Sequence, residues 1–184
     1  MLFICICIGY FLGALPFGYL IARAHGICIF TSGSGNPGAT NVLRTLGKKA
    51  GYTVFILDTG KGLLAAYIGV LLNFPYTTLF SALLGHSYSC FTHFKGGKGI
   101  ATLIGGLSCL VPIPLCMSLV LWGIVFKLTH YVSLASITFA WILPCFHFLH
   151  TGQCTVPLIL FACFTTWRHR SNLKRLFKGE EHHF

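Results

Sequence analysis

Residues 2 to 22 form an apolar run without a charged side chain, and this run constrains the fold more than any other feature. A helix of about 20 apolar residues is long enough to cross the hydrocarbon core of a bilayer. No basic residues precede the apolar stretch, so we interpret it as a retained span and not as a cleaved signal peptide. Comparable runs recur along the chain, and the sequence therefore predicts an all-α integral membrane protein.

The charge balance favours a membrane protein over a soluble basic one. The 184 residues include 13 Lys and Arg against 3 Asp and Glu, yet charged residues make up only 9% of the chain. Too few polar residues remain for a soluble nucleic-acid-binding domain, so we expect no nucleic acid partner. The positive charge instead favours anionic lipid head groups and anionic substrates.

The apolar runs divide into about seven expected transmembrane helices, some of them short. The prolines at 112 and 114 interrupt one long run and are expected to end one helix and begin the next. The expected spans are residues 2–22, 52–72, 76–93, 99–111, 113–127, 131–149 and 154–167. Five spans, with short segments merged or re-entrant, are the alternative. We expect a single domain over residues 1–184, since no internal repeat is visible.

The basic residues indicate an orientation. With seven spans, all 13 Lys and Arg fall on one side, whereas the turns at 73–75, 112–114 and 150–153 contain none. By the positive-inside rule, the N-terminus then lies outside and the C-terminus in the cytoplasm. The basic stretch 168–178 carries apolar residues at helical spacing, which predicts a short amphipathic helix at the membrane surface.

The polar segment from Gly33 to Arg44, Gly-Ser-Gly-Asn-Pro-Gly-Ala-Thr-Asn-Val-Leu-Arg, stands between apolar runs and is typical of an anion-binding loop. Its glycines are expected to adopt positive φ, so that backbone N–H groups converge on one anion. The segment also supplies polar side chains as donors, and Arg44 adds a planar cation suited to phosphate. The candidate residues are Gly33, Ser34, Gly35, Asn36, Gly38, Thr40, Asn41 and Arg44. A flexible connector between helices is the alternative.

Three further polar groups are expected near this segment. Asp58 and Lys61 lie at i and i+3 within an apolar run, where they can pair with each other or line a polar cleft. The other candidates are His86, Lys95, Gly96, Gly97 and Lys98, and, in the basic tail, His169 and Asn172. On one membrane face these groups would surround a phosphate. The alternatives are a positive-inside anchor for the lysine loop and lipid binding for the tail.

Several kinds of site are not supported. Neither Lys98 nor Lys61 stands in a Walker A pattern, and Asp58 is the only carboxylate within the membrane body, so no catalytic triad is evident. His147 and His150 share a helix face but lack a carboxylate or clear cysteine partner, so we expect no metal and no cofactor. The nine cysteines follow no disulfide spacing and are expected to be small buried hydrophobes.

The motifs, taken in order, resemble those of the PlsY-type acyl-phosphate:glycerol-3-phosphate acyltransferases of bacterial inner membranes. The resemblance covers almost the whole chain and rests on Gly33–Arg44, Asp58–Gly62, Gly85–His86 with Phe94–Thr102, and Arg168–Leu176 followed by Gly179 and Glu180. The chain departs from the family at two places. Apolar residues 27–30 replace an acidic-then-basic pair, and residues 87–89 replace an aromatic and a proline.

The resemblance implies transfer of a fatty acyl group from acyl phosphate to the 1-hydroxyl of sn-glycerol 3-phosphate. The product would be lysophosphatidic acid for phospholipid biosynthesis, and acyl-CoA and acyl carrier protein would not be direct donors. An acyl phosphate carries its own leaving group, so it needs orientation and charge neutralisation more than a protein nucleophile. The protein is then expected in the bacterial inner membrane, among membrane lipids, with a cytoplasmic active site and no protein partner.

The resemblance also assigns roles. Residues 34–41 would hold the donor phosphate and the developing oxyanion. Arg44, Lys98, His169 and Asn172 would hold glycerol 3-phosphate, with help from Lys95. Asp58 and Lys61 would form a supporting pair at the floor of the pocket. We expect direct attack by the glycerol hydroxyl with a substrate phosphate taking the proton, and His86 or His169 as general base is the second choice. A membrane permease or binding protein for an organic phosphate is the alternative function.

Overall fold

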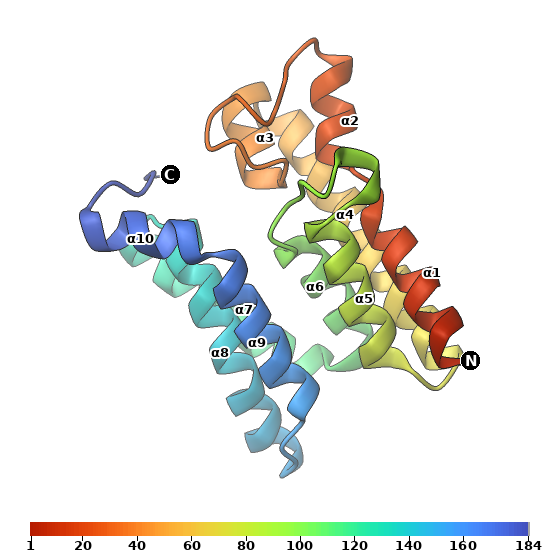
Figure 1. The fold of residues 1–184 in the computed structure, drawn as a ribbon. Coiled ribbons are helices and arrows are strands. Elements are labelled where there is room, and N and C mark those ends of the chain that lie inside the picture. Colours follow the sequence, from red (N-terminus) through yellow and green to blue (C-terminus); the bar gives the residue numbers. More distant parts are fainter. Residues whose placement is uncertain (184) are drawn as a thin grey trace. The chain divides into compact units, whose positions relative to one another are not determined.

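The computed structural model describes residues 1–183, and within that range helices are the only regular secondary structure. The helices group into two compact units, Met1–Leu110 and Val111–Phe184, which we call the N-terminal and C-terminal units. Figure 1 shows the course of the chain through each unit. The predicted all-α fold is confirmed, and the expectation of one domain stays a prediction.

The N-terminal unit contains six α-helices and one short 3-10 helix. They are α1 (Leu2–Ala14), α2 (Phe17–Ala24), α3 (Ala39–Leu46), α4 (Lys48–Leu71), α5 (Pro75–Ser87), η1 (Cys90–Thr92) and α6 (Ile100–Leu110). One continuous helix was predicted over residues 2–22, and this prediction is wrong. Pro16 lacks an N–H group and its ring obstructs the preceding turn, so the first helix ends at Ala14 and a second begins at Phe17.

Close backbone contacts pack the helices of the N-terminal unit. A Cβ atom built on Gly13 of α1 would lie 1.9 Å from the carbonyl oxygen of Ala82 in α5. A Cβ atom on Gly62 of α4 would lie 1.9 Å from the carbonyl oxygen of Thr102 in α6. Glycine at these positions lets the helix backbones touch, as is common between helices in membranes.

Loop and helix boundaries near the site also differ from the prediction. The connection between the expected spans 2–22 and 52–72 contains α3 and the first turn of α4. The span expected over 76–93 ends at Ser87, because the chain there leaves the helix for η1. Local apolar composition continues past Ser87, so it does not mark this end.

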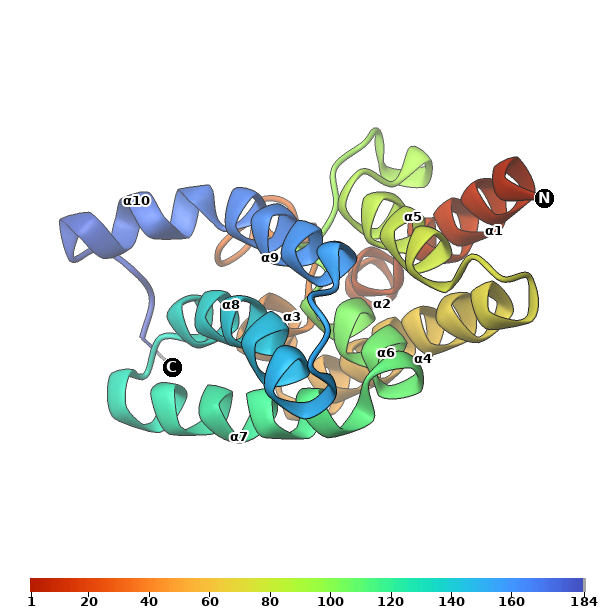
Figure 2. The ribbon, with the colours of Figure 1, turned by 90° about the horizontal axis from the view of Figure 1, so that it is seen from below.

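The C-terminal unit consists of α7 (Pro112–Thr129), α8 (Val132–Thr151), α9 (Val156–Arg168) and α10 (Arg170–Lys178). Figure 2 shows α8 lying along both α7 and α9. The predicted break at Pro112 is confirmed, because α6 ends at Leu110 and Pro112 is the first residue of α7. The predicted helix in the basic tail corresponds to α10.

Four helical stretches of the described chain are long and apolar enough to cross a membrane. They are Leu2–Ala24 taken through its break, Lys48–Leu71, Pro112–Thr129 and Val132–Thr151. Helices α6 and α9 are apolar but shorter. The count of about seven spans and the orientation of the termini stay predictions.

The cysteines lie elsewhere than expected. All nine are free thiols, but only Cys5 is buried. Cys28, Cys90, Cys116, Cys145, Cys154 and Cys163 are exposed. The expectation of buried cysteines is wrong, because Cys116, Cys145 and Cys163 lie on exposed faces of α7, α8 and α9 and the other exposed cysteines lie in segments that connect α-helices.

Candidate functional site

A buried ion pair lies within α4, where unpaired charges would be costly. The Nζ atom of Lys61 is 2.8 Å from Oδ1 of Asp58, and both side chains are 3% exposed. The spacing of i and i+3 places the two residues on one face of the helix. The predicted pairing of these residues is confirmed.

The break between α1 and α2 supplies Lys61 with a second partner. The ammonium group donates a hydrogen bond to the carbonyl oxygen of Leu15 at 2.9 Å. It also lies 5.6 Å from the centre of the Phe17 ring, within range of a cation–π interaction. Because a helix end leaves carbonyl groups without intrahelical donors, the break creates an acceptor for a buried cation. Pro16 was the signal in the sequence that could have located it.

His86 lies between the ion pair and the lysine loop. Its Nδ1 is 3.6 Å from Oδ1 of Asp58, an electrostatic contact longer than a hydrogen bond. Its carbonyl oxygen accepts a hydrogen bond from the N–H of Gly97 at 3.1 Å. A Cβ atom on Gly97 would lie 2.1 Å from Nε2 of His86, and one on Gly96 would lie 2.2 Å from its carbonyl oxygen. The glycine loop therefore rests directly on this histidine.

The segment after α5 is fastened by two hydroxyl groups that sequence reasoning missed. Ser89 donates to the carbonyl oxygen of Ala14 at 2.5 Å and accepts from the N–H of Phe91 at 3.2 Å. Thr92 donates to the carbonyl oxygen of Lys95 at 2.5 Å. Ser89 belongs to the stretch where the chain departs from the family pattern, and here its hydroxyl caps the end of α1.

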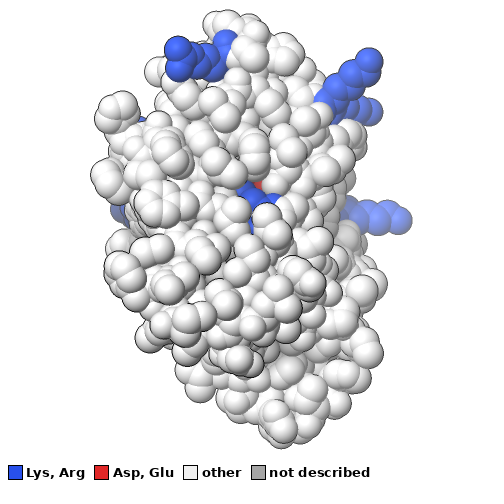
Figure 3. All heavy atoms as spheres, turned by 90° about the vertical axis from the view of Figure 1, so that its right-hand side faces the viewer, with Lys and Arg blue, Asp and Glu red and all other residues white. Residues whose placement is uncertain are grey.

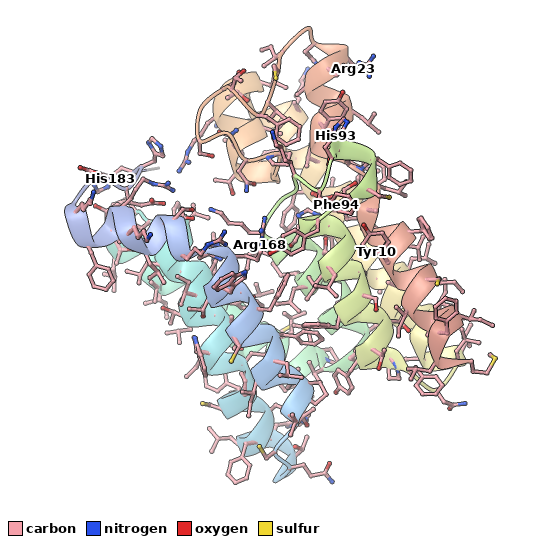
Figure 4. The ribbon with its side chains drawn as sticks, in the orientation of Figure 1. Tyr10, Arg23, His93, Phe94, Arg168 and His183 are labelled. Atoms are coloured by element: carbon pink, nitrogen blue, oxygen red, sulfur yellow. The ribbon has the colours of Figure 1, made fainter. Side chains whose placement is uncertain are left out.

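Two consecutive residues reverse the chain before Lys95. His93 and Phe94 have φ values of 51° and 59°, in the left-handed region that non-glycine residues rarely adopt. Figure 4 labels both residues in the loop that follows η1. The exposed Lys95 follows this turn, so local backbone strain helps to set where its side chain begins.

A pocket of about 260 Å³, which includes space open to solvent, lies within the N-terminal unit. Its lining combines the helix break, the ion pair and the lysine loop. It consists of Leu15, Pro16, Phe17, Gly18, Pro37, Asp58, Lys61, His86, Ser89, Thr92, Lys95, Gly96 and Gly97. Figure 3 shows blue Lys or Arg atoms beside red Asp or Glu atoms in a small opening near the middle of the face, with further blue side chains toward its edges. The structure thus brings together six of the candidate residues, namely Asp58, Lys61, His86, Lys95, Gly96 and Gly97.

The glycines of the anion-binding segment only partly match expectation. Gly33 and Gly35 have φ values of 58° and 69°, so their predicted left-handed conformation is confirmed. Gly38 has φ −72° and is the N-cap residue of α3, so its predicted positive φ is wrong. The turn is completed by Asn36, whose Oδ1 accepts a hydrogen bond from the N–H of Gly38 at 2.9 Å. An Asx turn makes a left-handed glycine unnecessary there.

Asn41 holds the same segment from within α3. Its side chain is buried, accepts from the N–H of Ser34 at 2.9 Å and donates to the carbonyl oxygen of Ser32 at 3.0 Å. The N–H groups of Ser34 and Gly38 are therefore bound by asparagine side chains of the segment itself. Asn36 and Asn41 therefore shape the loop, and the anion binding predicted for this segment stays a prediction.

An apolar cluster fixes the segment onto the helices. Ile29, Val42 and Val54, from the connector, α3 and α4, are fully buried together. Phe30 stacks on Tyr19 of α2 at a centroid distance of 5.8 Å. Residues 27–30 are the other departure from the family pattern, and within them Ile29 and Phe30 supply core packing just before the anion-binding segment.

The remaining cations of the N-terminal unit lie outside the pocket lining. Arg44 is exposed in α3, and Lys98 is half-buried just before α6. Ser34 and Thr40 are also half-buried, in the loop and in the first turn of α3. None of these four lines the pocket that Asp58 and Lys61 line.

The two candidate residues of the tail are buried and belong to the C-terminal unit. His169 lies 2.8 Å through Nδ1 from the carbonyl oxygen of Thr165. A carbonyl oxygen only accepts, so this contact requires a proton on Nδ1 and leaves the lone pair of the neutral ring on Nε2. Asn172 donates through Nδ2 to Oε1 of Glu181 at 2.6 Å.

Glu181 organises the end of the chain and was missed by sequence reasoning. Ser133 donates to its Oε1 at 2.9 Å, and Nε of Arg175 lies 2.8 Å from its Oε2. Burial alone would raise the pKa of Glu181, but these hydrogen bonds and that of Asn172 outweigh it and lower the pKa. His183, labelled in Figure 4, lies 2.8 Å through Nε2 from the hydroxyl of Tyr131. The two adjacent carboxylates after a basic helix, Glu180 and Glu181, were the available signal.

Metal ions in proteins require clusters of ligating side chains. Over residues 1–183, no three or more His, Cys, Asp and Glu side chains gather in a way that could hold a metal ion. His147 is buried near the end of α8, whereas His150 is exposed. The pocket described above is lined by lysines, one carboxylate, one imidazole, hydroxyl groups and glycine backbone.

Comparison with protein families identifies similar proteins over nearly the full length. A sequence model described as glycerol-3-phosphate acyltransferase matches residues 3–179. A protein named glycerol-3-phosphate acyltransferase from Fusobacterium nucleatum is 42% identical over 192 residues, covering 100% of this chain and 99% of that protein. One of the same name from Desulforudis audaxviator is 44% identical, covering 96% of this chain and 92% of that protein.

Two solved structures share the fold. The crystal structure of PlsY, an integral membrane glycerol 3-phosphate acyltransferase, in its glycerol 3-phosphate form is 39% identical with a TM-score of 0.93. Its lysophosphatidic acid form is 38% identical with a TM-score of 0.89. Both alignments cover 100% of this chain and 95% of the solved chain.

Proposed function

The chain belongs to the glycerol-3-phosphate acyltransferase family, and we propose that it transfers a fatty acyl group from acyl phosphate to the 1-hydroxyl of sn-glycerol 3-phosphate. The product is lysophosphatidic acid, a precursor in phospholipid biosynthesis. The observation that carries the proposal is the full-length similarity to a structure described as the glycerol 3-phosphate form of PlsY.

The chemistry of the candidate residues supports acyl phosphate as the donor. An acyl phosphate is a mixed anhydride whose leaving group is phosphate, so catalysis requires orientation and charge neutralisation. The N-terminal unit offers cations and loop donors for this purpose, and its one carboxylate, Asp58, is paired with Lys61. A protein nucleophile activated by a base and an acid is not needed for such a donor.

The phosphate groups are assigned to the basic residues of the polar loops. Arg44 can bind phosphate through two N–H groups at once, and Lys98 adds a point charge at the start of α6. Ser34 and Thr40 provide hydroxyl donors for the leaving phosphate and the oxyanion. Lys95, exposed at the pocket, assists in drawing an anionic substrate in.

The same proposal assigns His169 and Asn172 to glycerol 3-phosphate. Their side chains are held by Thr165 and Glu181, so the orientation of each is set before substrate arrives. The glycerol hydroxyl attacks the carbonyl directly, and a phosphate oxygen of the substrates takes its proton. General-base catalysis by His169 or His86 is the second choice for this proton transfer.

The chain is a multi-pass membrane protein, as its apolar helices and its similarity to PlsY indicate. We place it in the bacterial inner membrane with about seven spans, the N-terminus outside and the C-terminus in the cytoplasm. The one-sided distribution of Lys and Arg supports this orientation. The active site then faces the cytoplasm, where glycerol 3-phosphate is available.

A product assay tests the proposal. Purified protein in detergent is incubated with radiolabelled glycerol 3-phosphate and either palmitoyl phosphate or palmitoyl-CoA. We expect lysophosphatidic acid with palmitoyl phosphate and none with palmitoyl-CoA. Formation of product only from palmitoyl-CoA would overturn the proposed donor, and binding of glycerol 3-phosphate without any product would favour a permease or binding protein.

Two substitutions test the assigned phosphate ligands. Arg44→Ala and Lys98→Ala are each expected to reduce kcat/KM by at least about a hundredfold, since each removes a charge-assisted contact worth about 3 kcal/mol. Lys127→Ala, at the end of α7, is the matched control and should retain wild-type activity. Near wild-type activity in both site variants, with intact helical content, would refute the assigned roles.

A further inference from the structure

We propose that the buried pair of Asp58 and Lys61 is a positioning device that ties the two polar loops of the N-terminal unit to α4. The two loops are the Gly33–Arg44 segment and the Lys95–Gly99 loop. The proposal rests on the proposed function, because it explains how the phosphate-binding residues are held in place. In this role the pair does not bind substrate through its own charge.

The first tie runs from Lys61 to the Gly33–Arg44 segment. Lys61 holds the carbonyl oxygen of Leu15 at 2.9 Å, directly before the start of α2. In α2, a Cβ atom on Gly18 would lie 1.8 Å from the carbonyl oxygen of Pro37, so the helix backbone touches the polar segment. Movement of the helix break would therefore shift α2 against Pro37.

The second tie runs from Asp58 to the lysine loop. The carboxylate lies 3.6 Å from Nδ1 of His86. The carbonyl oxygen of His86 accepts a hydrogen bond from the N–H of Gly97 at 3.1 Å. The imidazole also fills the space next to the α-carbon of Gly97. The position of His86 consequently determines where the loop that carries Lys95 and Lys98 can lie.

The helix break is held from both sides, which makes it a fixed point. The carbonyl oxygen of Leu15 is bound by Lys61, and the carbonyl oxygen of Ala14 is bound by Ser89 at 2.5 Å. These donors come from α4 and from the segment after α5. Two successive carbonyl groups that the proline break leaves without helical partners thus join three parts of the chain.

The charge of the pair argues against direct phosphate binding. Lys61 and Asp58 are 2.8 Å apart and 3% exposed each, so they neutralise one another locally. Under the proposed function, Arg44, Lys95 and Lys98 supply the attraction for phosphate. A buried pair is costly to assemble and costlier to break, which suits a role in fixing geometry.

The test uses four variants of the full-length protein. Asp58→Asn and Lys61→Met each break the pair, and the double variant removes both buried charges and so avoids an uncompensated one. Lys49→Met, exposed in the first turn of the same helix, is the matched control. The readouts are KM for glycerol 3-phosphate, kcat with palmitoyl phosphate, and the rate of trypsin cleavage after the exposed residues Arg23 and Lys95.

If the pair positions the loops, both single variants raise KM for glycerol 3-phosphate at least about tenfold and accelerate trypsin cleavage at least about fivefold. The double variant is then no worse than the more impaired single variant, because all three break the same ties. Helical content stays at the wild-type level, and Lys49→Met behaves as wild type.

Two results would overturn the proposal. A direct phosphate ligand predicts that Asp58→Asn leaves KM unchanged or lowers it, because an unneutralised Lys61 attracts phosphate more strongly, while Lys61→Met raises it. A double variant with wild-type KM and wild-type trypsin cleavage also contradicts the ties. If the wild type forms no lysophosphatidic acid, the proposed function fails. Trypsin cleavage and glycerol 3-phosphate binding then still test whether the pair positions the two loops.

Discussion

The side-chain oxygen of Asn41 accepts a hydrogen bond from the backbone N–H of Ser34 at 2.9 Å, while its amide group donates to the carbonyl oxygen of Ser32 at 3.0 Å. One buried side chain thereby closes a loop of glycines onto the helix that follows it. A Cβ atom on Gly33 would lie 2.3 Å from Oδ1 of Asn41, so the backbone of Gly33 packs directly against this amide.

Replacement of Asn41 by Ala should release this loop. Two backbone groups lose their partners, so we expect the free energy of unfolding to fall by about 1–3 kcal/mol and kcat/KM to fall at least tenfold. Thermal unfolding and the product assay measure the two effects. Thr45→Val is the control, because its hydroxyl bonds only to carbonyl groups of α3, and it should change stability by less than about 0.5 kcal/mol. Equal behaviour of the two variants would contradict the role of Asn41.

Substitution of Gly97 by Ala should displace His86. The new methyl group would lie 2.1 Å from Nε2 of the imidazole, so either the ring or the lysine loop must move. We expect a loss of at least about tenfold in kcat/KM. Gly123→Ala is the matched control, since nothing lies within 4 Å of its Cβ position in α7. It should raise stability by about 0.5–1 kcal/mol through its higher helix propensity and leave activity unchanged. Wild-type kinetics in Gly97→Ala would show that the loop does not rest on His86.

Glu181 should make the stability of the protein depend on acid pH. Its pKa in the folded protein is lowered from 4.5, so the folded state favours the carboxylate more than the unfolded state does. This contribution is therefore complete at pH values above 4.5 and is lost as the pH falls through the folded pKa. Glu181→Gln should unfold at a lower temperature than wild type at pH 7, and the two proteins should converge toward pH 3.

The neighbouring acid provides the control for this measurement. Glu180 is exposed, so Glu180→Gln should follow the wild-type profile from pH 7 to pH 3. A constant difference between wild type and Glu181→Gln at every pH would mean that the carboxylate charge makes no contribution of its own.

Two exposed cysteines allow the orientation in the membrane to be measured. Cys28 lies in the connector after α2, and Cys154 lies in the turn between α8 and α9. Variants that retain only one of them are treated with an impermeant maleimide in vesicles of known orientation. We expect labelling of Cys28 only from the cytoplasmic side and of Cys154 only from the outside. Labelling of both from one side would contradict the seven-span arrangement.

The thiol of Cys28 should also react quickly. Hydrogen bonding with the side chain of Thr31, followed by bonding to the backbone near Phe30, lowers the pKa of this thiol. A larger fraction is then thiolate near neutral pH, and the thiolate is the reactive form. Thr31→Val should slow the labelling of Cys28 at pH 7, and it should leave the labelling of Cys154 unchanged.

Local sequence rules were sufficient for much of the architecture. The apolar runs predicted helices, Pro112 marked the boundary between α6 and α7, and the spacing of Asp58 and Lys61 predicted their ion pair. These features depend on proline geometry and on neighbours within one helical turn, which a sequence displays directly. The motif order from Gly33 to Asn172 was also enough to indicate the family.

Only the tertiary structure decided how these elements serve the site. The bond from Lys61 to Leu15 spans 46 positions in the chain, and that from Ser89 to Ala14 spans 75. Such partners are brought together by the packing of helices. No residue pattern near either member of a pair indicates that the other member will lie next to it. The same reason explains why the hydrogen bonds of Asn41 within its own loop, and the role of Glu181, were not predicted. The sequence by itself determined which residues carry charge and which prolines can end a helix, and packing determined which helix ends those charges contact.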